Sequence, residues 1–111
     1  MLMLEDKKLQ GVTLGEYKEF NIEDLKEQMK FVPEVQSWKT MHYANYRNKF
    51  LTFTVRARKF EGRVWIGING SDLFDTFFTD EAGVVKDQTP SIHYNDLIQE
   101  INFFIEGRYT A

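Results

Sequence analysis

Cysteine is absent from this 111-residue chain, and histidine and proline occur only twice each. Without cysteine there are no disulfide bonds, no thiol nucleophiles and no cysteine-ligated zinc, a pattern typical of proteins from a reducing compartment. His42 and His93 lie far apart in the sequence and give no metal-ligand spacing. We therefore expect neither a metal ion nor a cofactor.

Long apolar runs are also missing. No stretch approaches the roughly 20 apolar residues that a helix needs to cross a bilayer. The first residues, Met1 to Leu4, are apolar but meet Glu5 and Asp6 at once, so the basic start and long apolar centre of a signal peptide are lacking. These absences predict a cytoplasmic protein with no membrane contact.

Catalytic motifs are equally scarce. None of the serines stands in a Gly-x-Ser-x-Gly motif. Asp72 and Asp75 are three positions apart, so on a strand their carboxylates point to opposite faces. Gly62, Gly67 and Gly70 do not form a glycine-rich loop that opens a helix. We expect a protein that is not an enzyme.

The composition that is present indicates a globular protein. Hydrophobic residues make up 42% and charged residues 28%, which is ordinary for a folded domain, and ten phenylalanines favour a sheet-rich core. The length predicts a single domain over residues 1–111. The net charge of −3 conceals an asymmetry: residues 36–70 carry seven basic side chains and one acidic one, and the remainder carries seven basic and sixteen acidic ones.

Two runs of alternating apolar and polar residues occupy the middle of the chain, at 51–58 and 63–68. A period of two is typical of strands with one buried face. Glu61-Gly62 separates the runs, so we predict a β-hairpin that turns at this pair and places Arg58 opposite Trp65.

The predicted hairpin has two faces of opposite character. The apolar face is assigned to the core and consists of Leu51, Phe53, Val55, Val64, Ile66 and Ile68. The polar face is assigned to solvent and consists of Thr52, Thr54, Arg56, Arg58, Arg63 and Trp65.

Helix signals stand on both sides of this hairpin. Asn21 is a good N-cap for a helix that begins at Ile22 and that Pro33 ends. A broad apolar stripe predicts a last helix from Tyr94 to Glu106, capped by Ser91. The apolar helix residues expected in the core are Ile22, Leu25, Met29, Leu97, Ile98, Ile101 and Ile105.

The remaining segments complete the predicted order. We expect strands at 35–43 and 72–79, turns at 44–47, 69–71 and 80–83, a short edge strand at 84–86 and a loop at 88–90. Residues 1–19 show no clear period and are predicted to be a loosely ordered lead-in. The predicted fold is an α+β two-layer sandwich in the order helix, four-stranded antiparallel meander, helix, with both helices on one face of the sheet.

The polar face supplies the candidate site, formed by Thr54, Arg56, Arg58, Arg63 and Trp65. One hypothesis is a platform on which bases stack and guanidinium groups meet phosphates. A second has Arg58 covering Trp65 as a cation–π pair on a solvated face. A third has the acidic N-terminal helix or lead-in folding over this face and pairing with its arginines.

These hypotheses lead to three candidate functions. The first is a non-enzymatic protein-binding or regulatory module, with a protein partner or with self-association as a homodimer, for which an unpaired sheet edge is a second candidate surface. The alternative is a nucleic-acid-binding domain that uses the basic and aromatic face. The third is a small-molecule-binding enzyme of unknown chemistry.

Overall fold

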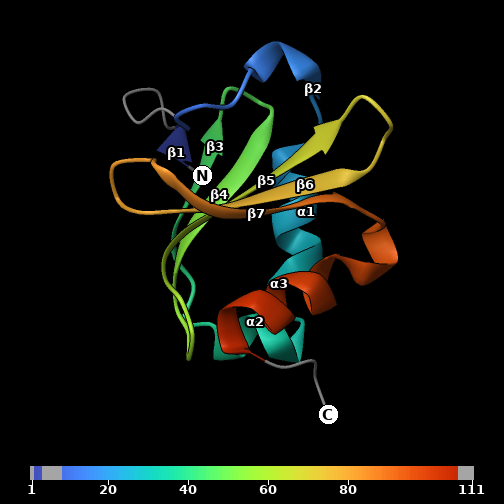
Figure 1. Cartoon of the computed structure of the whole chain (residues 1–111). Helices are drawn as coiled ribbons and strands as arrows, with labels where there is room; N and C mark the ends of the chain where they lie inside the picture. Colours follow the sequence, from blue (N-terminus) through green and yellow to red (C-terminus); the bar gives the residue numbers. More distant parts are fainter. Residues whose placement is uncertain (1, 4–8, 108–111) are drawn as a thin grey trace.

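The computed structural model describes residues 2–3 and 9–107 and shows an α+β fold (Figure 1). An open antiparallel meander forms its sheet, in which each of five strands pairs with the next along the chain. These strands are β3 (Met41–Tyr46), β4 (Phe50–Arg56), β5 (Glu61–Asn69), β6 (Phe74–Thr79) and β7 (Val85–Ile92). The α+β class and the meander are confirmed, but the meander has five strands where four were predicted.

Two short strands extend this sheet. β1 (Leu2–Met3) pairs parallel with β3, and β2 (Tyr17–Lys18) pairs antiparallel with the end of β5. β2 therefore takes up the part of β5 that lies beyond the start of β4.

The helices all pack on one face of the sheet (Figure 1). They are α1 (Ile22–Met29), α2 (Pro33–Ser37) and α3 (Leu97–Glu106), with short 3₁₀ turns η1 (Leu14–Glu16) and η2 (Tyr94–Asp96). The apolar residues predicted for the core all lie in or against one hydrophobic cluster between the helices and the sheet. No helix in the described part of the chain is long and apolar enough to cross a membrane.

α1 forms as its sequence predicts. The Asn21 side chain accepts a hydrogen bond from the Asp24 backbone N–H at 3.1 Å, which satisfies one free donor of the first turn. Ile22, Leu25 and Met29 lie on one side of the helix and are buried. The N-cap and the apolar face of α1 are confirmed.

α2 replaces the first half of the strand predicted at 35–43. Pro33 opens this helix, where its missing N–H costs nothing, and does not merely end α1. Val35 and Trp38 are buried, and the Trp38 indole donates to Asn102 Oδ1 on α3 at 2.8 Å. A tertiary tie between α2 and α3 thus outweighs the local strand propensity, and β3 begins only at Met41.

The turn predicted at 44–47 lies too early. β3 continues to Tyr46, and Arg47 and Asn48 form the turn with φ angles of +56° and +60°. The Lys49 N–H donates to the Tyr46 carbonyl at 3.1 Å, as in a two-residue type I′ hairpin.

The central hairpin is present, but its predicted turn and register are wrong. Arg56 pairs with Glu61, Thr52 faces Trp65, and the turn runs over residues 57–60. Gly62 is not at the turn but inside β5. A Cβ at this position would be 2.5 Å from the Thr79 carbonyl oxygen, so the close approach of β6 accounts for the glycine. The partner of Trp65 moves from Arg58 to Thr52, an even number of positions, so the assignment of side chains to the two faces survives.

In the last part of the chain the predicted helix is present, but the segment before it differs from the prediction. The turn after Asn69 is confirmed, but the predicted short strand at 84–86 and loop at 88–90 together form β7. β7 ends the sheet among the described strands, and such a strand tolerates Pro90 because an outward N–H is not needed. Ser91 is not the cap, because its N–H donates to Asp75 Oδ1 at 2.8 Å and Asp96 precedes α3. Gly107 ends α3 with a φ of +77°.

The lead-in prediction fails for residues 9–18, which we call the N-terminal strap; residues 1 and 4–8 lie outside the described part. The strap contains η1 and β2 and runs along one end of the sheet (Figure 1). Its residues Leu9 and Tyr17 pack in a hydrophobic cluster separate from the one that the helices cover. Its backbone is fixed where the Gln10 N–H donates to the Gly83 carbonyl at 3.0 Å. Leu9 and Tyr17 are buried. Apolar contacts, rather than a regular hydrophobic period, order this segment.

Candidate functional site

The polar face of the predicted hairpin lies opposite the helices, but half of it is not exposed to solvent. Trp65 is 0% exposed. The strap covers it and completes a second hydrophobic cluster, the aromatic cluster, formed by Leu9, Tyr17, Tyr46, Phe50, Trp65 and Phe77. The predicted exposure of Trp65 is therefore wrong, and the reason is a cover supplied by a segment distant in sequence.

The contacts of Trp65 differ from those hypothesised. Its indole N–H donates to Thr79 Oγ1 at 2.8 Å, and its ring meets Tyr46 edge-on with centroids 5.2 Å apart. The nearest cation is Arg63, whose guanidinium carbon lies 6.0 Å from the ring centroid, and not Arg58. A base cannot stack on an enclosed indole, so the stacking platform is not formed in this structure. The strap supplies the cover that the third hypothesis gave to the lead-in, whereas α1 lies on the other face of the sheet.

Tyr17 anchors the strap through a polar contact at the rim of the aromatic cluster. Its hydroxyl donates to Asp75 Oδ2 at 2.6 Å. Burial raises the pKa of Tyr17, and the hydrogen bond to the Asp75 carboxylate raises it further. The other Asp75 oxygen accepts from the side chain of Asn69 and the backbone of Ser91, both at 2.8 Å. Asp75 thus joins β2, β5, β6 and β7, a structural role.

Arg63 lies beside the aromatic cluster and is 5% exposed. Its Nη1 donates to Thr52 Oγ1 at 3.1 Å and to the His42 carbonyl at 3.4 Å, two neutral acceptors. Its Nε is buried and has no hydrogen-bond partner. Burial lowers the pKa of Arg63, and the charge of Glu81 partly offsets this. The cation that sequence reasoning placed in solvent is therefore enclosed.

The uncovered half of the same face forms a polar cleft of about 530 Å³. Lys39, Met41 and His42 line it on the side of β3, and Thr54 and Arg56 line it on β4. Glu61 on β5 and Asp80 and Glu81 after β6 complete its opposite side. Arg63 adjoins this cleft, because its acceptor His42 and its cross-strand neighbour Thr54 are both lining residues.

The charges in the polar cleft are largely matched. Arg56 Nε lies 3.3 Å from Glu61 Oε1, and Lys86 Nζ lies 3.6 Å from Asp80 Oδ2. Backbone N–H groups of Val84 and Ala82 and the charge of Lys86 lower the pKa of Asp80. Asp80 and Glu61 thus each have a basic ion-pair partner, an arrangement that does not resemble a proton-transfer pair.

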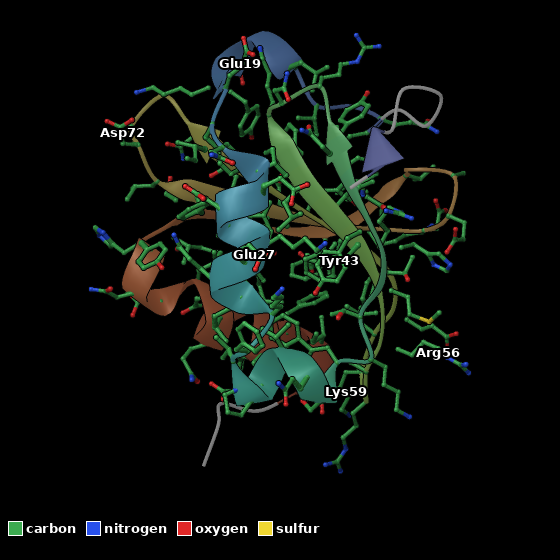
Figure 2. All side chains as sticks on the ribbon, turned by 180° about the vertical axis from the view of Figure 1, so that it is seen from behind. Glu19, Glu27, Tyr43, Arg56, Lys59 and Asp72 are labelled. Carbon is green, nitrogen blue, oxygen red and sulfur yellow. The ribbon has the colours of Figure 1, made fainter. Side chains whose placement is uncertain are left out.

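Arg58 does not join the other predicted site residues. It lies in the β4–β5 turn, where its backbone N–H donates to Glu106 Oε1 at 3.1 Å. Arg56 and Lys59 extend from the same end of the molecule, as Figure 2 shows. Of the five predicted residues, the structure brings Thr54, Arg56 and Arg63 together, encloses Trp65 and places Arg58 at the turn.

A helix groove of about 230 Å³ lies between α1 and α3, a surface that sequence reasoning missed. Its apolar lining consists of Leu25, Met29, Val32, Leu97 and Ile98, and Gln28, Tyr94 and Asn95 line the rest. The Tyr94 hydroxyl donates to Gln28 Oε1, which joins the two helical segments across the groove. Tyr94 is nevertheless 58% exposed. The sequence feature that could have indicated this groove is the apolar stripe of the last helix, which includes Tyr94 and is broader than a contact with the sheet requires.

The sheet edge at β7 carries features that oppose strand pairing. Pro90 lies in β7 and offers no backbone N–H, and the pairing of β6 with β7 shifts register twice. Bulges, proline and charged side chains are the means by which natural edge strands avoid edge-to-edge association. β-augmentation at β7 is accordingly disfavoured.

Metal binding and similarity to known proteins give no further direction. Within residues 2–3 and 9–107, no group of three His, Cys, Asp or Glu side chains could hold a metal ion. No family model matches the sequence, and neither a curated protein nor a solved structure matches it. Function therefore has to be inferred from surface depressions such as the polar cleft and the helix groove.

Proposed function

We propose that this protein is a non-enzymatic protein-binding module that receives an apolar side chain of its partner in the helix groove. The observation that carries this proposal is an apolar groove with Tyr94 exposed at its border. Interface anchors are typically aromatic or aliphatic side chains that fill such depressions, and tyrosine is enriched among the residues that contribute most to binding.

Charge specifies the partner further. The helical segments 22–37 and 93–106 carry seven acidic residues and two lysines. Glu27 projects from the outer side of α1 (Figure 2). Complementary potentials favour association and suppress wrong partners. The partner segment therefore carries an apolar anchor flanked by lysine or arginine.

The same features weaken the two alternatives. An acidic helix layer repels a phosphate backbone, whose affinity depends on the number of charges neutralised, and Trp65 is not available for stacking. Exposed basic residues are scattered, with Arg56 and Lys59 at one end, Arg47 in the β3–β4 turn and Lys86 on β7. No arrangement among the described residues favours an enzyme.

Selection of peptides from a random display library against the full chain tests this proposal. Peptides with an apolar residue between basic ones are expected, and their dissociation constants should rise with salt because exposed charges are screened. Tyr94→Ala should weaken binding by about tenfold or more, the loss typical of an important anchor. Phe103→Ala is the matched control, since Phe103 is also exposed on α3 but does not line the groove.

Two results would contradict the proposal. Selected peptides without basic residues, or peptides that bind Tyr94→Ala as tightly as the unchanged protein, would remove the groove as the site. Light scattering adds a separate check: a dimer that Tyr94→Ala dissociates would assign the groove to a second copy of the chain.

A further inference from the structure

The side chain of Asn69, at the end of β5, joins the β5–β6 turn to the neighbouring strands. Its Oδ1 accepts the backbone N–H groups of Ser71 at 2.9 Å and Leu73 at 3.2 Å. Its Nδ2 donates to Asp75 Oδ1 at 2.8 Å and to Ser91 Oγ at 3.3 Å. Because backbone N–H groups can only donate, the side-chain oxygen faces the turn and the NH₂ group faces the Asp75 carboxylate.

Gly70 follows Asn69, and this is the only Asn-Gly pair in the sequence. Asparagine before glycine is chemically labile, because no side chain hinders the next backbone nitrogen. The Gly70 nitrogen loses its proton and bonds to the side-chain carbon of Asn69, the bond from that carbon to Nδ2 breaks, and ammonia leaves. Water then opens the resulting succinimide at either of its C–N bonds, which gives aspartate or isoaspartate at position 69.

The folded structure opposes the first step of this reaction. Asn69 lies in β5 and pairs with Tyr17 of β2, and an extended backbone holds the next nitrogen away from the side-chain carbon. The N–H groups of Ser71 and Leu73 also fix the side-chain oxygen. We propose that Asn69 is a deamidation site that the native turn protects, and that its conversion releases the N-terminal strap.

Neither product fits the native network. Aspartate at position 69 places a second carboxylate within hydrogen-bond distance of Asp75, and two carboxylates so close disfavour each other's ionised form. Asp75 also holds the Tyr17 hydroxyl at 2.6 Å, so the strap loses its anchor when Asp75 moves. Isoaspartate inserts its Cβ into the main chain and shifts the pairing with Tyr17. Both products therefore loosen the cover of Trp65, and this inference does not rest on the helix groove.

Deamidation kinetics test the protection. The unchanged full chain is incubated at mildly alkaline pH, folded in buffer or unfolded in guanidinium chloride, and the proteolytic peptide that contains Asn69 is followed by mass spectrometry. We expect deamidation to be about tenfold faster or more in the unfolded chain, because reaction in the folded state waits for the turn to open. Gly70→Ala is the matched control: its Cβ would have no atom within 4 Å in the folded protein, but in the unfolded chain it hinders the attack and should slow deamidation.

Asn69→Asp reproduces one product and tests the release of the strap. Hydrogen exchange of the Trp65 indole N–H in the ¹⁵N-labelled protein should become about tenfold faster or more at neutral pH, which corresponds to a repulsion of at least one pKa unit. The Trp38 indole, which donates to Asn102 on α3, should exchange as before.

Asn45→Asp is the control for a carboxylate at a hairpin turn. Its amide also accepts a backbone N–H at 2.8 Å, but its Nδ2 donates to Asn48 Oδ1, a neutral group, at 2.9 Å. No carboxylate is its hydrogen-bond partner in these contacts, so Asn45→Asp should leave the exchange of the Trp65 indole unchanged.

Four results would overturn the proposal. In the kinetics, these are deamidation of the folded chain as fast as that of the unfolded chain, and deamidation of unfolded Gly70→Ala as fast as that of the unchanged sequence. In the exchange experiment, they are an unchanged Trp65 indole in Asn69→Asp, and equal acceleration of the Trp38 and Trp65 indoles. The kinetics of the unchanged chain still decide if Asn69→Asp does not fold.

Discussion

Thr79→Val tests the enclosure of Trp65, on which the distinction between a covered and an open sheet face depends. The change keeps the shape of the side chain and removes the hydroxyl that accepts the Trp65 indole N–H at 2.8 Å. Both residues are 0% exposed, so water cannot replace the lost acceptor. An unsatisfied buried donor costs about 1–3 kcal/mol.

The matched control is Thr76→Val on the same strand. Thr76 is also 0% exposed, but its hydroxyl donates to the Thr89 carbonyl at 3.3 Å and accepts no indole. Urea unfolding should show Thr79→Val to be the more destabilising of the two by about 1 kcal/mol or more. Its melting temperature should fall by on the order of 5–15 °C. Equal destabilisation by the two variants would refute the buried indole–hydroxyl pair and reopen Trp65 as a surface residue.

Two further predictions concern the strap and the aromatic cluster. Gly67→Ala should destabilise the protein by about 1–3 kcal/mol in urea unfolding, because a Cβ would lie 2.5 Å from Cε1 of the Phe50 ring. Gly70→Ala is the control, since a Cβ there would have no atom within 4 Å. Equal destabilisation by the two variants would contradict the packing of Phe50 against Gly67. The raised pKa of Tyr17 makes the folded protein keep the Tyr17 proton at a pH where the unfolded chain has lost it. Ionisation of Tyr17 should therefore lower the free energy of unfolding above about pH 10, by up to ~1.4 kcal/mol per pH unit. Urea titrations from pH 8 to 11 should show a smaller fall in Tyr17→Phe, and an identical fall would exclude this origin.

The amphipathic patterns of the sequence predict which side of the hairpin meets the helices, because strand alternation has a period of two. The register could not be predicted from Glu61-Gly62 alone. The actual turn is held by distant groups: Phe60 packs against Phe104 of α3 with ring centroids 5.8 Å apart, and the Lys59 N–H donates to the Ile105 carbonyl at 2.6 Å. Local turn propensity yields to such tertiary contacts.

The two prolines illustrate the same limit. The sequence pattern predicts that Pro33 ends a helix, although proline is equally suited to the first position of the next helix. The pattern likewise predicts a loop at Pro90, although a strand at the edge of a sheet accepts proline. Pro33 is excluded from a helix interior but fits either the end of one helix or the start of the next. Pro90 is excluded from a central strand but fits either a loop or an edge strand. Only the tertiary position of each segment decides between the two possibilities.

For the candidate site, the pattern predicted a shared face but not its cover. Thr54, Arg56 and Arg63 lie together as alternation requires. The enclosure of Trp65 depends on Leu9 and Tyr17, which belong to a segment without hydrophobic period.

Gly67 is a local sequence feature that indicates close packing on the face that carries Trp65. A glycine inside a strand marks close approach by a neighbour, and here the Phe50 ring from β4 fills the space. Such crowding on a nominally polar face means that this face is itself packed. β5 is consequently a strand buried on both sides, with residues 62–67 enclosed throughout. A central strand enclosed in this way has no free side-chain face for a partner, so the proposed binding module would have to use a surface formed by other elements, such as the helix groove.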